Sequence, residues 1–133
     1  MDGAASGRRR VSVAGPDVSA GPLQVVEEHI RAFNACDLDA VMAGFDEDAV
    51  FSTAEHLAVG ARAISRLFAD SFAAPAMARL ELQRAVVQGD TVGCELTELI
   101  EAEGVGHTLE VAAFYTVRGG RIARVRIYRD LTS

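Results

Sequence analysis

The segment that most constrains the fold is residues 92–102, in which successive side chains alternate between two faces of different character. A period of two is typical of a β-strand with one buried side. The face expected to be buried carries Val92, Cys94, Leu96, Glu98, Ile100 and Ala102. Glu98 therefore stands within an apolar row, where an ionised carboxylate is costly unless a partner compensates it. Because acid–base catalysis uses carboxyl groups in such surroundings, the segment indicates a pocket.

Turns that contain glycine divide the second half of the chain into strands. The turn signals are Gly89-Asp90, Gly104-Val105-Gly106 and Gly119-Gly120. They predict a meander of four consecutive strands. The first carries Leu80 and Leu82, and the others span residues 92–102, 107–117 and 121–131.

The first half of the chain is predicted to be mainly helical. Pro22 suits the first turn of one helix, and Asp37 can cap a short second one. Residues 46–48 are predicted to form a solvated corner, and residues 49–53 have the pattern of a strand. Residues 56–60 are predicted to be a loop, and residues 64–72 have the pattern of a third, amphipathic helix. Helices on one face of an antiparallel sheet make an α+β domain. We expect a cone-shaped roll of three N-terminal helices on a curved, mostly antiparallel sheet, with an internal pocket between the layers.

Length and composition exclude several classes of protein. The 133 residues favour a single domain over residues 21–133, and residues 1–20, rich in Gly, Ala and Ser, are predicted to be a disordered tail. A net charge of −6 argues against nucleic acid as a partner. The chain has no lysine, which excludes Schiff-base chemistry. No apolar stretch approaches the roughly 18 residues of a membrane span, so we expect no membrane partner and a cytoplasmic location.

Metal and cofactor binding are not expected from the residues present. Cys36 and Cys94 are too few for a disulfide framework or a cysteine zinc site. The three histidines and Glu98 are donor types that zinc accepts, but no pair of them has the helical spacing of metal ligands. We therefore expect neither a metal nor a cofactor.

Three further side chains combine polar chemistry with predicted burial. Tyr115 and Arg129 lie on the apolar faces of the last two strands, and His29 lies on the apolar side of the first helix. In the catalytic interpretation, Glu98 is a general acid or base, and His29 and Tyr115 position or polarise a substrate oxygen. In the structural alternative, Glu98 is paired with Arg129 or hydrogen-bonded to His29 or Tyr115, without turnover. Arg129 can hold an anionic substrate or reach solvent along its stem.

Four stretches carry a resemblance to a known family. They are residues 33–41 (FNACDLDAV), 45–51 (FDEDAVF), 60–64 (GARAI) and the ending from Val117 to Tyr128. Together they resemble the nuclear-transport-factor-2-like superfamily, and within it the SnoaL-like, limonene epoxide hydrolase and ketosteroid isomerase branches. The resemblance implies helices on a curved sheet and an apolar pocket. Members of this superfamily include isomerases, dehydratases, cyclases and epoxide hydrolases.

The resemblance also implies which residues line the pocket. The base and the two oxygen-binding groups of the isomerases fall at Thr53, His29 and Ala113. The catalytic positions of the epoxide hydrolases are largely occupied by other residue types here, and only Glu98 retains a carboxylate; the positions are Phe51, Thr53, Leu96, Glu98 and Ile127. The expected ligand-binding residues are Phe33, Phe51, Thr53, Leu96, Val111, Ala113, Ile127 and Arg129.

Two functions remain open from the sequence. The first is a small cofactor-independent enzyme that acts on a hydrophobic, oxygenated small molecule, by acid–base chemistry of the cyclase, isomerase, dehydratase or epoxide hydrolase type. The alternative is a non-catalytic, dimeric ligand-binding or assembly module of the same fold. Phe114 and Tyr128 lie among charged residues on the other face of the predicted sheet, which favours a homodimer formed through the sheet.

Overall fold

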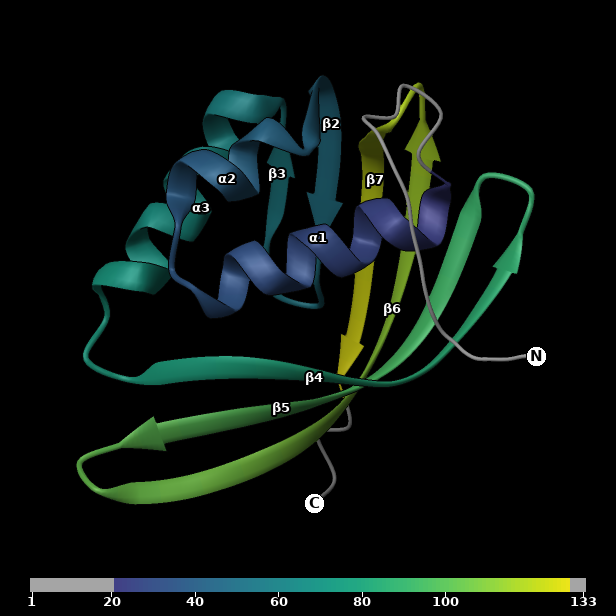
Figure 1. Cartoon of the computed structure of the whole chain (residues 1–133). Helices are drawn as coiled ribbons and strands as arrows, with labels where there is room; N and C mark the ends of the chain where they lie inside the picture. Colours follow the sequence, from purple (N-terminus) through teal and green to yellow (C-terminus); the bar gives the residue numbers. More distant parts are fainter. Residues whose placement is uncertain (1–20, 130–133) are drawn as a thin grey trace.

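The computed structural model describes residues 21–129 as three helices packed against one face of a six-stranded sheet (Figure 1). The helices are α1 (Pro22–Asn34), α2 (Leu38–Ala43) and α3 (Ala61–Ala73). The strands are β2 (Phe45–Ser52), β3 (Leu57–Val59), β4 (Met77–Gln88), β5 (Thr91–Ala102), β6 (Val105–Arg118) and β7 (Arg121–Arg129). The predicted α+β class is confirmed. The predicted tail at residues 1–20 and the predicted end of the last strand at residues 130–131 lie outside the described residues.

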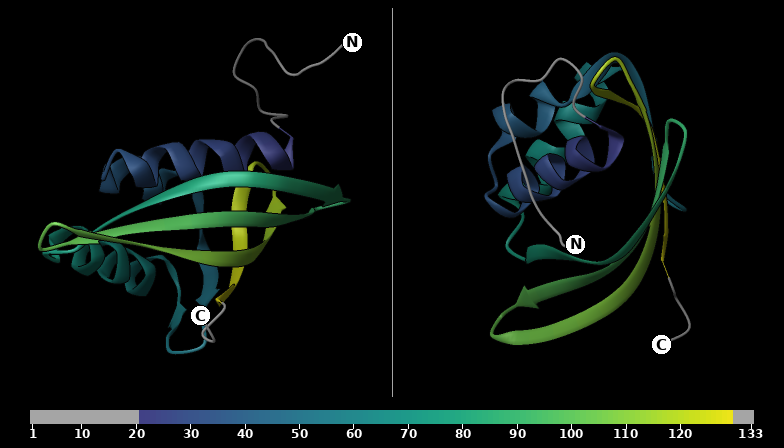
Figure 2. Two further views of the ribbon diagram at one scale, coloured as in Figure 1. Left: turned by 90° about the horizontal axis from the view of Figure 1, so that it is seen from below. Right: turned by 45° about the vertical axis from the view of Figure 1, so that its right-hand side comes forward.

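The sheet is strongly curved, and the helices lie on its concave side (Figure 2). Its strand order is β3-β2-β7-β6-β5-β4. All neighbouring strands are antiparallel except β2 and β7, which run parallel. The long hairpins β4–β5 and β5–β6 carry the curvature away from the helices, so that one end of the concave face extends beyond them (Figure 1). None of the described helices combines the length and the apolar character needed to cross a membrane.

Helix α1 forms because its apolar side chains recur at helical spacing. Pro22 occupies the first turn, where its missing N–H costs no hydrogen bond. The buried side of the helix consists of Val25, Val26, His29, Ile30 and Phe33. At its end, the Asn34 side chain donates to the Leu80 carbonyl at 2.9 Å and accepts from the Leu80 N–H at 2.8 Å. This amide takes the place of a neighbouring strand on the free edge of β4, and so fixes the end of α1 against the sheet.

The alternation predicted for residues 92–102 holds along β5. Val92, Cys94, Leu96 and Glu98 are buried, and Ile100 and Ala102, near the strand end, are half-buried. Glu95 and Glu101, of the opposite parity, are exposed. The face that carries Glu98 therefore points toward the helices, as the period of two predicts.

Three boundaries differ from the predictions. The turn before β6 is formed by Glu103 and Gly104, both with positive φ, so β6 begins at Val105. Residues 46–48, predicted as a solvated corner, belong to β2, where the pairing with β7 is irregular. Residues 57–59, predicted as a loop, form the edge strand β3. In each case pairing with a neighbouring strand extends regular structure into a segment whose residue types favour a turn.

Candidate functional site

The site is organised around an ion pair on the concave face of the sheet. Glu98 on β5 is only 7 % exposed, and Arg129 lies at the end of β7. The Arg129 Nε–H donates to Oε1 of Glu98, with 3.0 Å between the nitrogen and the oxygen. Oε2 of Glu98 accepts no hydrogen bond from any described residue. The carboxylate is therefore compensated on one oxygen, and the other is available to a ligand.

The strand register explains why these two residues meet. Glu98 pairs with Leu109 on β6, and Arg129 pairs with Val111, two residues further along the same strand and on the same face. Both pairs present their side chains on the concave side, so the long Arg129 side chain reaches across β6 to the carboxylate. Its side chain is 31 % exposed, against 9 % for that of Glu98. The Arg129 side chain therefore extends from the buried carboxylate toward the solvent at the end of β7.

Apolar side chains surround the carboxylate on the neighbouring strands. Glu98 stands between Leu80 on β4 and Leu109 on β6, and both are half-buried. Leu80 is the residue whose backbone Asn34 holds, so the end of α1 is anchored beside Glu98. Incompletely covered leucines around a single acid form a surface on which an apolar ligand can pack with its polar group against Glu98.

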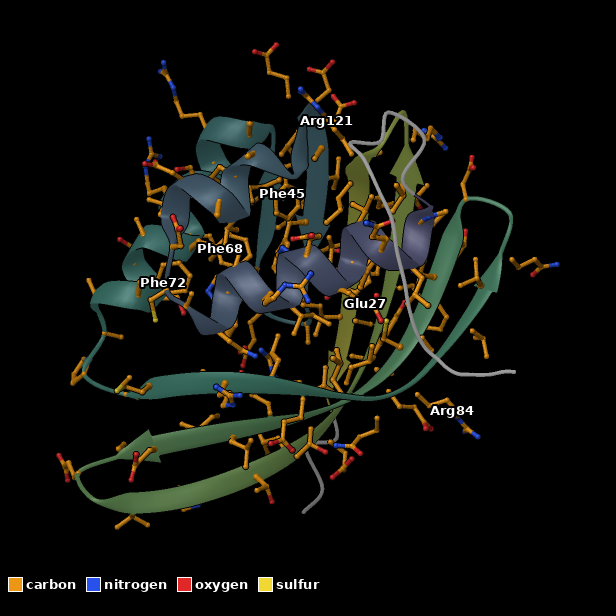
Figure 3. The ribbon with its side chains drawn as sticks, viewed as in Figure 1. Glu27, Phe45, Phe68, Phe72, Arg84 and Arg121 are labelled. Atoms are coloured by element: carbon orange, nitrogen blue, oxygen red, sulfur yellow. The ribbon has the colours of Figure 1, made fainter. Side chains whose placement is uncertain are left out.

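A second cluster forms around His29 on α1. The imidazole is 6 % exposed and stands at T-shaped angles to the rings of Phe45, Phe68 and Tyr115, with centroids 5.4, 5.9 and 5.7 Å away. Burial lowers the pKa of His29 to about 4, so the ring is neutral at neutral pH. Its Nδ1 is buried without a hydrogen-bond partner among the described residues. Figure 3 shows Phe45, Phe68 and Phe72 on the helix-covered side of the sheet.

Tyr115 and Cys94 are kept protonated by the same apolar interior. Burial raises the pKa of the Tyr115 phenol above its ordinary value, and the neighbouring Cys94 adds to the effect. Burial raises the pKa of the Cys94 thiol to about 11, with a smaller contribution from the negative charge of Glu27. Since the thiolate is the nucleophilic form, Cys94 is unsuited to nucleophilic catalysis at neutral pH. Tyr115 can act there only as a neutral hydroxyl group.

The structure brings His29 and Tyr115 together but places Glu98 elsewhere. Tyr115 pairs with Val92, whereas Glu98 lies six residues further along β5. At about 3.3 Å per residue, the two positions are roughly 20 Å apart along the strand. Glu98 therefore lies on a different part of the concave face from Tyr115 and its neighbour His29. The predicted catalytic residues fall into two groups, at the two ends of one face.

Most of the predicted ligand-binding residues lie in or between these two groups. Phe33 and Phe51 contact Phe68, their ring centroids lying 6.1 and 5.4 Å from its own, and so belong to the His29 cluster. Between this cluster and Glu98, the concave face carries two rows of residues that are paired across neighbouring strands. The first row contains Ala113 and Ile127, and the second contains Leu96, Val111 and Arg129. Apart from Arg129, the side chains of these rows are apolar, and they connect the two groups.

Thr53 serves a local turn. It follows β2, and its Oγ1 accepts hydrogen bonds from the backbone N–H groups of Glu55 and His56 at 3.1 and 3.0 Å. His56 and His107 are exposed. Within residues 21–129, no three His, Cys, Asp or Glu side chains are grouped as metal ligands. Among these predicted residues, Thr53 is the one whose hydroxyl is already engaged by the fold.

Two residues important to the site were not singled out from the sequence. Phe68 touches His29, Phe33, Phe45, Phe51 and Phe72, and so forms the centre of the aromatic cluster. Its helical spacing with Ile64 and Phe72 marked it only as a core residue. Asn34 is the other, and no pattern in the sequence indicates that its amide bonds to a strand 46 residues away.

Comparisons with known proteins agree with this architecture. The family model of the SnoaL-like domain matches residues 26–125. No curated protein matches the chain. An LEH-like epoxide hydrolase from M. tuberculosis is similar in structure, with a TM-score of 0.76 and 22 % identity over 83 % of each chain. So is a protein with a ketosteroid isomerase-like fold from Catenulispora acidiphila, in complex with trimethylamine; its TM-score is 0.76, with 20 % identity over 86 % of this chain and 90 % of that one. Both likenesses show the fold.

A third solved structure has higher sequence identity. A candidate polyketide cyclase from Sinorhizobium meliloti is 28 % identical, with a TM-score of 0.66 over 77 % of this chain and 92 % of that chain. The family match and these structures bear out the resemblance inferred from residues 33–41, 45–51, 60–64 and 117–128.

Proposed function

The chain belongs to the SnoaL-like domain family, and from this premise we propose that it is a small enzyme that moves a proton on a hydrophobic, oxygenated small molecule, without a cofactor. The reaction belongs to the cyclase, isomerase, dehydratase or epoxide hydrolase type, in all of which a proton is removed or delivered near an oxygen. Similarity to a candidate polyketide cyclase and to an epoxide hydrolase supports this class of substrate. The proposal places the enzyme in the cytoplasm, as expected from the sequence.

The observation that carries the proposal is the buried Glu98, one oxygen of which accepts no hydrogen bond from the residues that the structure describes. In this mechanism Oε2 takes the proton, either from a carbon next to a carbonyl or from a water that attacks the substrate. Arg129 holds Oε1 and supplies a positive charge that compensates the ionised carboxylate in its apolar surroundings. Leu80 and Leu109 pack against the hydrophobic part of the substrate on either side of the acid.

His29 and Tyr115 have a different part in this proposal. Because they lie roughly 20 Å along the strand from Glu98, they bind the remote end of a ligand rather than the reacting bond. The Tyr115 hydroxyl and Nδ1 of His29, which has no partner within residues 21–129, are suited to a ligand oxygen at the aromatic end of the face. In this proposal the connecting rows through Ala113 and Val111 bind its apolar body on the concave face of the sheet.

A matched pair of variants tests the catalytic role. Hydrophobic ketones and epoxides of polyketide and terpenoid type are incubated with the full chain in deuterated water, and both conversion and deuterium incorporation are followed by mass spectrometry. Glu98→Gln keeps the shape but cannot accept the proton, and we expect its turnover to fall by a factor of about 10²–10⁴. Glu101→Gln, an exposed position on the same strand, should keep the rate. Equal rates in both variants would refute the assignment.

The Glu98–Arg129 pair also supports a second function, a non-catalytic module that binds a ligand or assembles with a partner. Its specific support is that the acid is already paired and is remote from His29 and Tyr115. On this alternative, Glu98→Gln lowers the free energy of unfolding, whereas ligands bind wild-type protein without any conversion. Calorimetric binding with the same compounds, alongside the turnover assay, separates the two functions.

A further inference from the structure

The face of the sheet that the helices leave uncovered has a shallow hollow of about 380 Å³. Its lining residues alternate along the strands with buried ones such as Tyr115 and Val125, so their side chains point away from the helices. They are Thr91, Phe114, Thr116, Arg124, Arg126 and Tyr128. Two guanidinium groups, two aromatic rings and two hydroxyl groups therefore meet in a space of the size that small molecules occupy.

The strand register places the two arginines side by side. Thr91, Thr116 and Arg124 form one row across β5, β6 and β7. Phe114 and Arg126 form the next row on this face. The two arginines are two residues apart on β7, which is roughly 7 Å along the strand. The hollow thus has two cationic groups on one side, with an aromatic ring and the threonine hydroxyls beside them.

The Arg126 guanidinium packs over the ring of Tyr128. Its central carbon lies 5.9 Å from the centroid of that ring. The Tyr128 ring in turn stands edge-on to the ring of Phe114, with 6.1 Å between the centroids. A guanidinium that packs over a ring uses its flat face for this contact, and its N–H groups still point outward in its own plane. The ring contact therefore orients the cation without occupying its hydrogen-bond donors.

Neither arginine of the hollow is paired with a carboxylate of the described residues. The ion pairs within residues 21–129 are Arg31–Glu28, Arg84–Glu95 and Arg129–Glu98. Glu95, which belongs to the same cross-strand row as Tyr128, is held by Arg84. Arg118 and Arg121, where β6 ends and β7 begins, add further positive charge. A small anion is therefore attracted to this part of the chain, although its net charge is −6.

We propose that the hollow binds a small, planar aromatic carboxylate. The carboxylate accepts hydrogen bonds from the guanidinium groups of Arg124 and Arg126, whose planar arrangement of donors matches its two oxygens. The aromatic ring of the ligand packs on Phe114, which is 46 % exposed. A bare anion would leave this ring exposed, and a neutral aromatic molecule would leave both guanidiniums without an acceptor. The lining therefore favours a ligand that combines the two parts.

This site is separate from the proposed enzymatic function, because Glu98 and His29 lie on the other face of the sheet. Its test therefore uses binding, and no turnover assay enters it. The homodimer expected from the sequence would use the same face, and a second copy bound there would cover the hollow. Ligand and second copy thus exclude each other, so the titration uses the lowest chain concentration at which heat can be measured.

Calorimetric titration of the full chain with 2-naphthoate tests the site. The neutral comparison is 2-naphthylmethanol, which has the same rings without the charge, and we expect it to bind at least about tenfold more weakly. Arg124→Gln and Arg126→Gln should each raise the Kd for 2-naphthoate about tenfold, because each removes a charged donor. Arg62→Gln, at an exposed position on α3, is the matched control and should leave the Kd unchanged.

NMR of the wild-type chain locates the ligand without any substitution, since the ring protons of Phe114 and Tyr128 should shift as 2-naphthoate is added. Circular dichroism of each variant separates loss of binding from loss of the fold. Folded arginine variants that both keep the wild-type Kd would overturn the proposal. Equal affinity for 2-naphthylmethanol or for inorganic phosphate would also overturn it, as would a wild-type chain that binds no 2-naphthoate.

Discussion

Two glutamates on β5 form ion pairs with arginines at nearly the same distance and in opposite surroundings. Glu95 Oε1 lies 3.1 Å from Arg84 Nε, and Glu98 Oε1 lies 3.0 Å from Arg129 Nε. The side chains of the first pair are 59 % and 70 % exposed, and Arg84 points away from the helices in Figure 3. Those of the second pair are 9 % and 31 % exposed. Glu98 lies three residues after Glu95 on the same strand, so the two side chains point to opposite faces of the sheet. The pair on one face is exposed, whereas on the other face the acid is desolvated.

The comparison shows that burial, rather than pairing, distinguishes the candidate site. Exposed pairs contribute about 0–1 kcal/mol because water and salt screen them. A buried acid that loses its partner destabilises the fold far more, since its desolvation is no longer compensated. Changes of charge and pH on the helix-covered face should therefore alter the stability of the fold strongly. The same changes on the opposite face, which the helices leave uncovered and which we call the outer face, should alter it only weakly.

The largest expected difference between the two faces is the response to acid. The pKa of His29 is about 4 in the folded state and near 6.5 when the ring is exposed by unfolding. The unfolded chain thus binds more protons between these values, and stability must fall as the pH falls. The contribution is complete above pH 6.5 and is lost progressively toward pH 4, by about 3 kcal/mol in all. Urea denaturation at half-unit pH intervals measures it.

His29→Leu should remove that part of the pH dependence, because the uncharged side chain cannot gain a proton on unfolding. His56→Leu, at an exposed position, should retain it. If His29→Leu keeps the full slope between pH 6.5 and 4, the burial of the imidazole is not its source.

Next in size is the removal of one arginine from each pair. Arg129→Met leaves the Glu98 carboxylate without its cationic partner, and we expect the free energy of unfolding to fall by about 2 kcal/mol. This is less than the ~3–5 kcal/mol of a fully buried pair, because Arg129 is partly exposed. Arg84→Met should change it by less than about 0.5 kcal/mol. Equal losses in the two variants, measured in the same buffer, would mean that burial does not distinguish the pairs.

A smaller loss is expected from Asn34→Ala, which removes the contact that holds α1 beside the concave face. Two hydrogen bonds to Leu80 disappear, at a cost of about 1–2 kcal/mol. Hydrogen exchange should also become faster at the Leu80 amide, whose protection depends on the Asn34 side chain. Gln24→Ala on the exposed side of α1 is the control. Unchanged exchange at Leu80 would contradict the role assigned to Asn34.

The smallest effect concerns the outer face. A Cβ atom at Gly93 would lie 3.3 Å from both Phe114 Cε2 and Val86 Cγ2, which are ends of side chains with space to move. Gly93→Ala should therefore cost less than about 1 kcal/mol, below the usual penalty for overpacking a closed core. It should also displace the Phe114 ring, which NMR of the aromatic protons can detect. A loss above 2 kcal/mol would show that this face is packed as rigidly as the concave one.

Much of the candidate site could be predicted, and part of what was missed had a local signal. The inward direction of Glu98 follows from alternation along one strand. The separation of Glu98 from Tyr115 was also encoded locally, in the turn between the two strands. A two-residue turn at Glu103-Gly104 pairs Ala102 with Val105, and this register places Glu98 opposite Leu109, six residues from Tyr115. Placing the turn at residues 104–106 obscured that register. The partner of Asn34, by contrast, depends on how a helix docks on a distant strand.

The order of the elements apart from the short edge strand β3, the buried side of each helix and the direction of Glu98 all follow from the amino-acid sequence, because propensity and periodicity act between near neighbours in the chain. The pairing of Glu98 with Arg129, 31 residues away, and the contact of His29 with Tyr115 at the other end of the face are properties of the folded chain. Those contacts depend on strand register, sheet curvature and helix docking together. Such non-local geometry is fixed only when the whole chain packs.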